Sequence, residues 1–138
     1  MQEFLKDGLR FHKQMSEIFK KPWTPEANRY SRAIRPAILL EIIESLNKGE
    51  INLLFYCITY MNSKNELAVK LISKMKMDKM TKARAKKSLI EKGYIWIDSR
   101  TNQVLVNPSV ALLTKHRTEC LEMIKEWNNI NRDTLVEE

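Results

Sequence analysis

Apolar residues recur at helical spacing through the N-terminal part of the chain, and prolines divide it into separate helices. Phe and Ile follow this spacing over residues 2–20, and a second apolar stripe runs over 38–46, after the restart that Pro36 requires. Gly49 is expected to end this second helix, because glycine readily adopts the left-handed conformation of a C-terminal cap. The pattern predicts a helical N-terminal extension over residues 1–48.

A close succession of helices is predicted for the middle of the chain. Residues 51–61 are apolar almost all round, which favours a buried central helix, although their β-branched and aromatic content leaves a strand open. Residues 66–75 repeat Leu, Ile and Met on one face, as in a short amphipathic helix. Asp78 is a suitable N-cap for a further helix over residues 79–92, and Gly93 is suited to end it.

A hairpin and a long helix are expected to follow. Two β-rich runs, 94–98 and 103–107, are separated by the turn-forming letters SRTN, and Pro108 ends the second run. Residues 109–131 then read as one long amphipathic helix, and the last few residues as a frayed tail.

This order of elements predicts a mainly α fold of the winged helix-turn-helix class, with additional N-terminal helices and a long C-terminal helix. In that class, the second helix of the turn pair enters the major groove of DNA and the hairpin flanks it. The expected division is an N-terminal helical extension over 1–48, a DNA-binding core over 49–108, and a C-terminal helix and tail over 109–138.

The charge distribution along the chain indicates the kind of partner that it binds. The chain carries a formal net charge of +7, and residues 64–100 alone hold eleven basic and four acidic side chains, so the whole excess lies there. One contiguous basic stretch is typical of a polyphosphate-binding surface, although a solvated lysine-rich face has the same composition. No apolar run is long enough to span a membrane and the first residues lack a secretory signal, so we expect a cytoplasmic protein that makes no membrane contact.

The helix over 79–92 and the tip of the hairpin supply the candidate DNA contacts. A helical projection places Ala85 and Leu89 on the core side and Arg84 and Lys87 opposite. Arg84 is the side chain best suited to bind a guanine through two hydrogen bonds, and the lysines suit phosphates. Arg100 is either the hairpin contact or an ordinary solvated turn residue. The predicted DNA-binding set is Lys79, Thr81, Lys82, Arg84, Lys87, Ser88 and Arg100.

No catalytic or metal-binding constellation stands out, so we expect neither an enzyme nor a cofactor. The acidic residues are scattered along helix surfaces, and no phosphate-cradling motif is present. Cys57 and Cys120 lie in apolar helical stretches and are interpreted as core thiols rather than as a disulfide or a zinc site. His12 and His116 lie on charged stretches and are expected to face solvent.

Several short motifs resemble the winged-helix replication initiators of small bacterial plasmids, the RepL type. The similarity covers about residues 50–112, and its motif residues are Met61, Asn62, Asn65, Asn107 and Pro108. The chain departs from that family where its recognition helix begins, having Asp78 and Thr81 in place of Ser-x-x-Thr. The resemblance implies a plasmid or phage replication initiator that binds an origin in double-stranded DNA without catalysis and recruits the replication machinery.

The chain also resembles the multiple-antibiotic-resistance class of dimeric winged-helix repressors. Helices before the turn motif, a long C-terminal helix, and Asp98 with Arg100 in the hairpin carry this second similarity. It implies transcription regulation by a homodimer joined through its terminal helices. The apolar stripes over 2–20 and 109–131 fit such a dimer, and equally fit helices that fold back onto their own domain.

A protein-interaction adaptor is the remaining hypothesis, because winged-helix folds do not fix function. Trp96 alternates with Ile95 and Ile97, so it points away from the side that those two share. An exposed Trp96 would anchor a protein partner, whereas a buried one would pack on a terminal helix.

Overall fold

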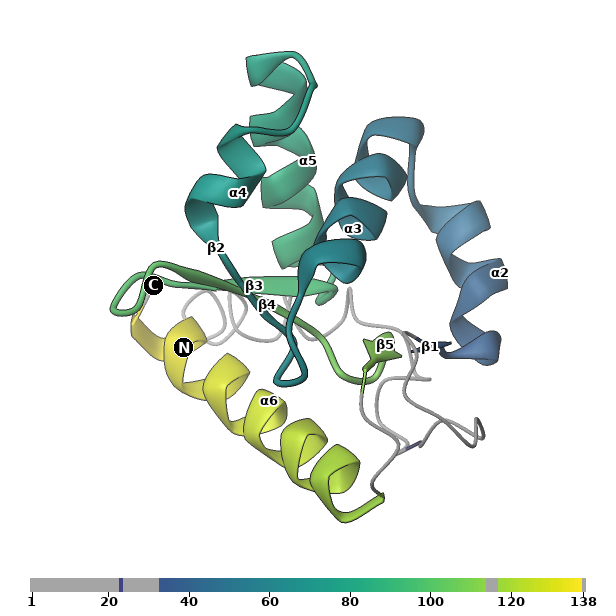
Figure 1. Cartoon of the computed structure of the whole chain (residues 1–138), viewed down its shortest axis with the longest axis vertical. Helices are drawn as coiled ribbons and strands as arrows, with labels where there is room; N and C mark the ends of the chain where they lie inside the picture. Colours follow the sequence, from purple (N-terminus) through teal and green to yellow (C-terminus); the bar gives the residue numbers. More distant parts are fainter. Residues whose placement is uncertain (1–22, 24–32, 114–116, 138) are drawn as a thin grey trace, which may run out of the picture.

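The computed structural model describes residues 23, 33–113 and 117–137, and these contain five helices and five strands (Figure 1). The helices are α2 (Pro36–Ser45), α3 (Lys48–Tyr60), α4 (Val69–Ser73), α5 (Lys79–Glu91) and α6 (Arg117–Glu137). The strands are β1 (Ala33–Ile34), β2 (Glu66–Ala68), β3 (Ile95–Asp98), β4 (Gln103–Val106) and β5 (Ala111–Leu112). The predicted helix over 2–20 and both histidines lie outside the described residues.

The predicted hairpin is confirmed, and a further strand extends it into a small antiparallel sheet of order β2-β4-β3. The prediction of one helix over 66–75 is therefore wrong in its first half. Leu67 is buried between the half-buried Glu66 and Ala68, which is the alternation of a strand, and it pairs with Val104. The helix that remains, α4, has only five residues.

Helices cover both faces of this sheet (Figure 1): α3 and α5 lie on one side and α6 on the other. The paired residues Ile97 and Val104 point into the main core beside Leu54 and Leu89. The next register pair, Trp96 with Leu105, faces the other way, and Trp96 packs against Trp127 of α6. The predicted buried helix over 51–61 is confirmed as α3, whose Leu53 and Leu54 are fully buried.

The junction between α2 and α3 corrects the role assigned to Gly49. Helix α2 begins at Pro36 as predicted but ends at Ser45, and Gly49 lies inside α3. Asn47 begins α3 with a capping box: its side chain accepts from the Glu50 N–H, and the Glu50 carboxylate accepts from the Asn47 N–H, both at 2.9 Å. A Cβ at Gly49 would lie 3.2 Å from Cγ2 of Thr81, so this position lets α3 and α5 approach closely.

The expectation of one helix over 109–131 is wrong at both ends. Residues 111–112 form β5, which pairs with β1, and α6 runs from Arg117 to Glu137, through most of the expected tail. The backbone N–H of Arg35 also donates to the Val110 carbonyl at 2.8 Å. Described residues from all three expected segments, including Ile38, Leu54 and Val110, belong to one core cluster.

The described length of α6 folds back onto its own domain, the alternative that the sequence leaves open. Its apolar stripe consists of Cys120, Ile124 and Trp127, each at most 5% exposed. The exposed apolar side chains are found elsewhere, chiefly on α2, where Leu40 and Ile43 are 63% and 70% exposed. Within the described ranges, no helix is both long and apolar enough to cross a membrane.

Both cysteines are buried and neither forms a disulfide, as predicted. Burial raises the pKa of Cys57 to about 12 and, helped by Glu119, also raises that of Cys120. Because the thiolate is the reactive species, we expect an aromatic disulfide reagent at pH 8 to label the native chain at least ~100-fold more slowly than the denatured chain. Absorbance of the released thiolate measures both rates, and rapid labelling of either thiol in the native chain would contradict the buried placement.

Candidate nucleic-acid interface

Helix α5 is held at both ends by the residues that the sequence indicates. Asp78 caps its start: the carboxylate oxygen Oδ2 accepts from the Thr81 N–H at 3.0 Å and from the Thr81 hydroxyl at 3.2 Å. These two bonds hold the pKa of Asp78 below its usual range, so the cap stays ionised near neutral pH. Gly93 follows the helix with a φ of 83°, the left-handed conformation expected of a C-terminal cap.

The two sides of α5 differ as the helical projection predicts. Ala85 and Leu89 are 3% and 0% exposed and pack into the core against α3 and the sheet. Arg84 and Lys87 are exposed on the outer side, together with Met80, whose side chain is 63% exposed. The helix therefore presents a cationic outer face that the rest of the described fold leaves open.

Lys82 has an internal role at the end of α4. Its Nζ donates to the carbonyl of Met75 at 2.9 Å and to that of Ser73 at 3.3 Å. These carbonyls belong to the last residue of α4 and to the turn after it, where helical backbone bonds run out. Lys82 therefore fixes the connection between α4 and α5, and its ammonium group is already engaged.

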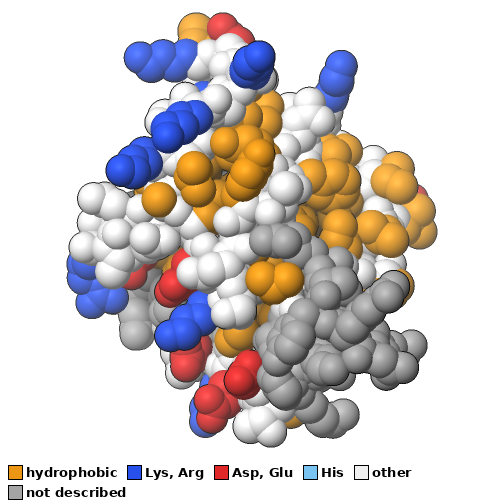
Figure 2. Space-filling model, viewed as in Figure 1, with side chains coloured by type: hydrophobic (Ala, Val, Ile, Leu, Met, Phe, Trp, Pro, Cys, Tyr) orange, Lys and Arg blue, Asp and Glu red, His pale blue; other side chains and the backbone are white. Residues whose placement is uncertain are grey.

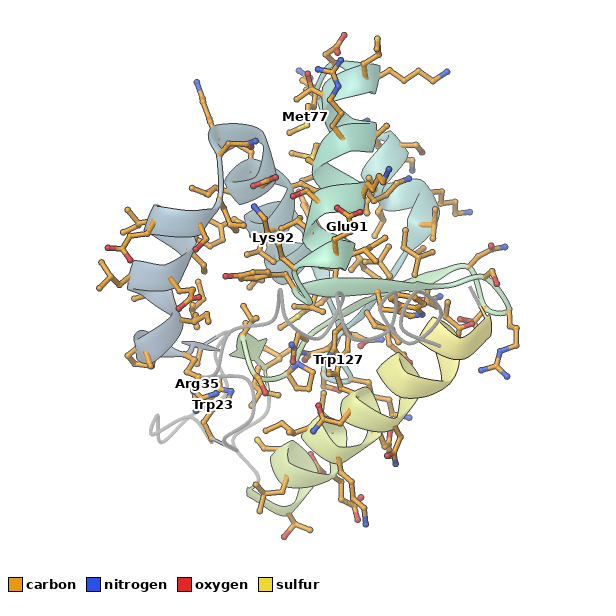
Figure 3. The ribbon with its side chains drawn as sticks, turned by 180° about the vertical axis from the view of Figure 1, so that it is seen from behind. Trp23, Arg35, Met77, Glu91, Lys92 and Trp127 are labelled. Atoms are coloured by element: carbon orange, nitrogen blue, oxygen red, sulfur yellow. The ribbon has the colours of Figure 1, made fainter. Side chains whose placement is uncertain are left out.

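Ser88 also points inward, toward the buried carboxylate of Glu50 on α3. Burial alone would raise the pKa of Glu50, but hydrogen bonds from Ser88, the Asn47 N–H and Lys92 lower it below its usual range. Lys92 Nζ lies 3.3 Å from Glu50 Oε1 and 2.8 Å from the Ser45 carbonyl. Figure 3 shows Lys92 at the end of α5 nearest the sheet, where these contacts hold α5 against α3.

Arg100 lies in the turn between β3 and β4, as the sequence predicts. Its side chain is 89% exposed, and its Nε lies 3.6 Å from Asp98 Oδ1, which also accepts from the Arg100 N–H at 3.0 Å. Asn102 completes the turn with a φ of 55° and accepts a hydrogen bond from the Val69 N–H through its carbonyl. This bond joins the hairpin turn to the start of α4, beside a groove of about 570 Å³.

The basic side chains of these elements gather on one part of the surface. Figure 2 shows Lys and Arg along the outer edge of α4 and α5, and again beside the hairpin. Exposed lysines of α4 and the following turn, Lys70, Lys74 and Lys76, extend the face of α5. These three lysines belong to the basic stretch of the sequence, but the sequence does not identify them as part of this surface. The reason is that residues 66–75 read as one continuous helix, whereas α4 begins only at Val69.

Trp96 and two of the three asparagines of the initiator-like motifs stabilise the fold. Trp96 is 6% exposed and packs on α6, so it is not an exposed anchor for a protein partner. Asn65, with a φ of 61°, donates through Nδ2 to the carbonyls of Val106 and Ala111. Asn107 donates to the Gly93 carbonyl at 2.7 Å and accepts from the Ser109 N–H at 2.8 Å. All three residues join the hairpin to its surroundings.

Comparisons with known proteins found no match among family models, curated proteins or solved structures. Within the residues that the structure describes, no group of three or more His, Cys, Asp or Glu side chains is placed to hold a metal ion. The geometry and charge of the α4–α5 surface are therefore the main indication of function.

Proposed function

We propose that this chain is a winged-helix protein that binds double-stranded DNA through α5. The element order α3, β2, α4, α5, β3, β4 and the sheet order β2-β4-β3 fit the winged helix-turn-helix plan. In that arrangement, α4 and α5 are the turn pair, α5 is the recognition helix, and the β3–β4 turn is the wing. The Lys82 bonds to the carbonyls after α4 support a fixed angle between the two helices.

The observation that carries this proposal is the exposed cationic outer face of α5. Lys79, Arg84 and Lys87 are exposed there, and Arg100 extends from the wing. Phosphate contacts on any duplex would come from Arg84 and the lysines, including those of α4, and Arg84 would also contact bases at a preferred site. Thr81, Lys82 and Ser88 are assigned to positioning α5, because all three side chains have partners within the chain.

A narrower proposal concerns the biological role. The motif residues Asn62, Asn65 and Asn107 fit the resemblance to plasmid replication initiators, which implies origin binding without catalysis and recruitment of replication proteins. A homodimer on a palindromic site is part of the same proposal. Because α6 buries its described apolar stripe within the chain, a dimer contact would draw on exposed residues such as Leu40 and Ile43 of α2.

Duplex binding across a salt series tests the DNA proposal. Fluorescence anisotropy with a labelled random-sequence duplex is expected to give affinity that falls steeply with salt, because binding releases counterions. Arg84→Ala and Lys87→Ala should each weaken binding about fivefold and lower the salt slope by about 0.9 for each phosphate that the variant no longer neutralises.

Lys125→Ala is the matched control, because it removes one exposed charge from α6, on the opposite side of the sheet from α5. It should leave both the affinity and the slope close to wild type. Weak binding that is insensitive to salt, or an equal loss of affinity in all three variants, would exclude α5 as the DNA-binding surface.

A further inference from the structure

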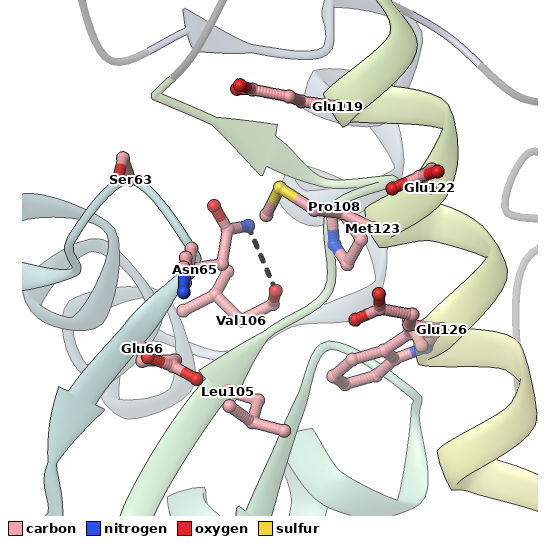
Figure 4. Close-up of a pocket in the computed structure, with 12 residues that line it drawn as sticks. Ser63, Asn65, Glu66, Leu105, Val106, Pro108, Glu119, Glu122, Met123 and Glu126 are labelled. Atoms are coloured by element: carbon pink, nitrogen blue, oxygen red, sulfur yellow. Dashed lines mark hydrogen bonds between the residues drawn. The ribbon is translucent and has the colours of Figure 1, made fainter.

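A cavity of about 410 Å³ lies between α6 and the β2–β4 side of the sheet, and no residue of α5 lines it (Figure 4). Its apolar wall includes Leu105, Pro108, Met123 and Trp127. The volume is within the range of small-molecule sites, which combine an apolar lining with a few polar groups.

The polar part of this lining is acidic, although the chain as a whole is basic. Four glutamates line the cavity and a single lysine, Lys64, accompanies them. Glu122 and Glu126 are both exposed and lie one turn apart on α6, so their negative charges repel each other. A cation between these carboxylates would relieve that repulsion, whereas an anion would add to it.

Asn65 provides a second and independent observation. It is 2% exposed, and its Nδ2 donates to the carbonyls of Val106 at 3.0 Å and Ala111 at 2.8 Å. The opposite amide orientation would set Oδ1 against two carbonyl oxygens, so these bonds fix where each atom lies. Oδ1 is buried and has no hydrogen-bond donor in the part of the chain that the structure describes.

The unpaired Oδ1 defines the chemistry of the missing partner. A buried carbonyl oxygen without a donor costs about 1–3 kcal/mol, and an N–H or O–H group in the cavity would remove that cost. Figure 4 shows the Asn65 amide projecting between β2 and the Met123 side chain of α6. The cavity therefore combines a buried acceptor without a donor, Asn65 Oδ1, with an acidic lining that favours a cation.

We propose that this cavity binds an organic cation, an alkyl- or arylammonium whose N–H groups donate to Asn65 Oδ1. Glu122 and Glu126, the rim glutamates, supply the compensating negative charge. The apolar body of the ligand packs against Met123 and Trp127. The site is separate from the cationic face of α5, and its occupancy does not depend on whether the chain binds DNA.

Hexylammonium and hexan-1-ol form a matched pair of probes, because they share an apolar body and differ in charge. The indole N–H of Trp127 is buried without an acceptor among the described residues, which makes its NMR signal a sensitive reporter. A titration of the full chain at constant ionic strength, with the signal assigned through Trp127→Phe, measures binding. Hexylammonium should shift the signal with saturation near ~1 mM, and hexan-1-ol should bind at least tenfold more weakly.

Two substitutions on the rim test the charge argument. Glu122→Gln and Glu126→Gln should each weaken hexylammonium binding, by about fivefold when combined, while the exposed Glu91→Gln of α5 leaves it unchanged. Equal affinity for the alcohol, binding that ignores both rim substitutions, or a signal that does not saturate would overturn the proposal. The DNA experiment reads a different surface, so the two proposals can fail separately.

Discussion

Asn65→Ala is expected to lower the free energy of unfolding by about 2–4 kcal/mol, the largest effect of any single substitution proposed for this chain, although the change also removes the unpaired Oδ1. The change removes the donor of two buried hydrogen bonds, to the carbonyls of Val106 and Ala111, and each orphaned buried carbonyl costs about 1–3 kcal/mol. Alanine must also adopt the φ of 61° found at Asn65, which costs a non-glycine residue about 1 kcal/mol or more.

Two further variants separate these contributions in urea denaturation. Asn65→Gly keeps the left-handed backbone accessible and should recover only about 1 kcal/mol of the loss. Asn102→Ala tests the backbone alone, because Asn102 has a φ of 55° but is exposed at the hairpin turn. If Asn102→Ala and Asn65→Ala destabilised the chain equally, the buried amide bonds would contribute nothing.

The position of Asn65 explains what the initiator-like motifs contribute physically. Asn62 Oδ1 accepts from the N–H groups of Lys64 and Glu66, which turns the chain into β2. Asn65 then ties β2 to the end of β4, and Asn107 ties the same end to Gly93. These side chains stabilise the sheet that packs against α5. The resemblance to replication initiators therefore supports the predicted fold more directly than the predicted DNA contacts.

The elements that the sequence predicts correctly are those with local signals. Helix α5 has its cap at Asp78 and its end at Gly93, and β3 and β4 flank a short turn. Strands β1, β2 and β5 have two or three residues each, and they form because partners far along the chain supply their hydrogen bonds. Such pairings leave no periodicity that a single sequence can display.

The candidate site divides in the same way. The sequence predicts that Arg84 and Lys87 face outward because the projection of one helix decides it, and both are exposed. Lys82 and Ser88 lie at the edges of that projection, and their orientation depends on neighbours in other elements: the turn after α4 and Glu50 of α3. The sequence does not single out Glu50, because its capping-box position requires α3 to begin before Gly49, the residue expected to end α2.

The second large effect on stability is expected from a substitution at Glu50. Glu50→Ala removes half of the capping box of α3 and leaves Ser88 and Lys92 of the α5 segment without their shared acceptor. We expect a loss of about 2–3 kcal/mol in the free energy of unfolding, from the cap and the partly buried charge-assisted bonds together. Ser88→Ala should cost about 1 kcal/mol and leave duplex affinity and salt slope unchanged, the opposite pattern to Arg84→Ala.

The pH dependence of stability distinguishes the charge of Glu50 from its size. The pKa of Glu50 is lower in the folded chain than its usual value, so the unfolded chain binds its proton more readily. Its contribution is therefore fully present above about pH 5 and is lost as the pH falls through the folded-state pKa. Denaturation of wild type and Glu50→Gln should differ most near neutral pH and converge only as the pH falls through the folded-state pKa, below the usual range for glutamate. A constant difference for Glu50→Gln at every pH would mean that packing, not charge, holds α5 against α3.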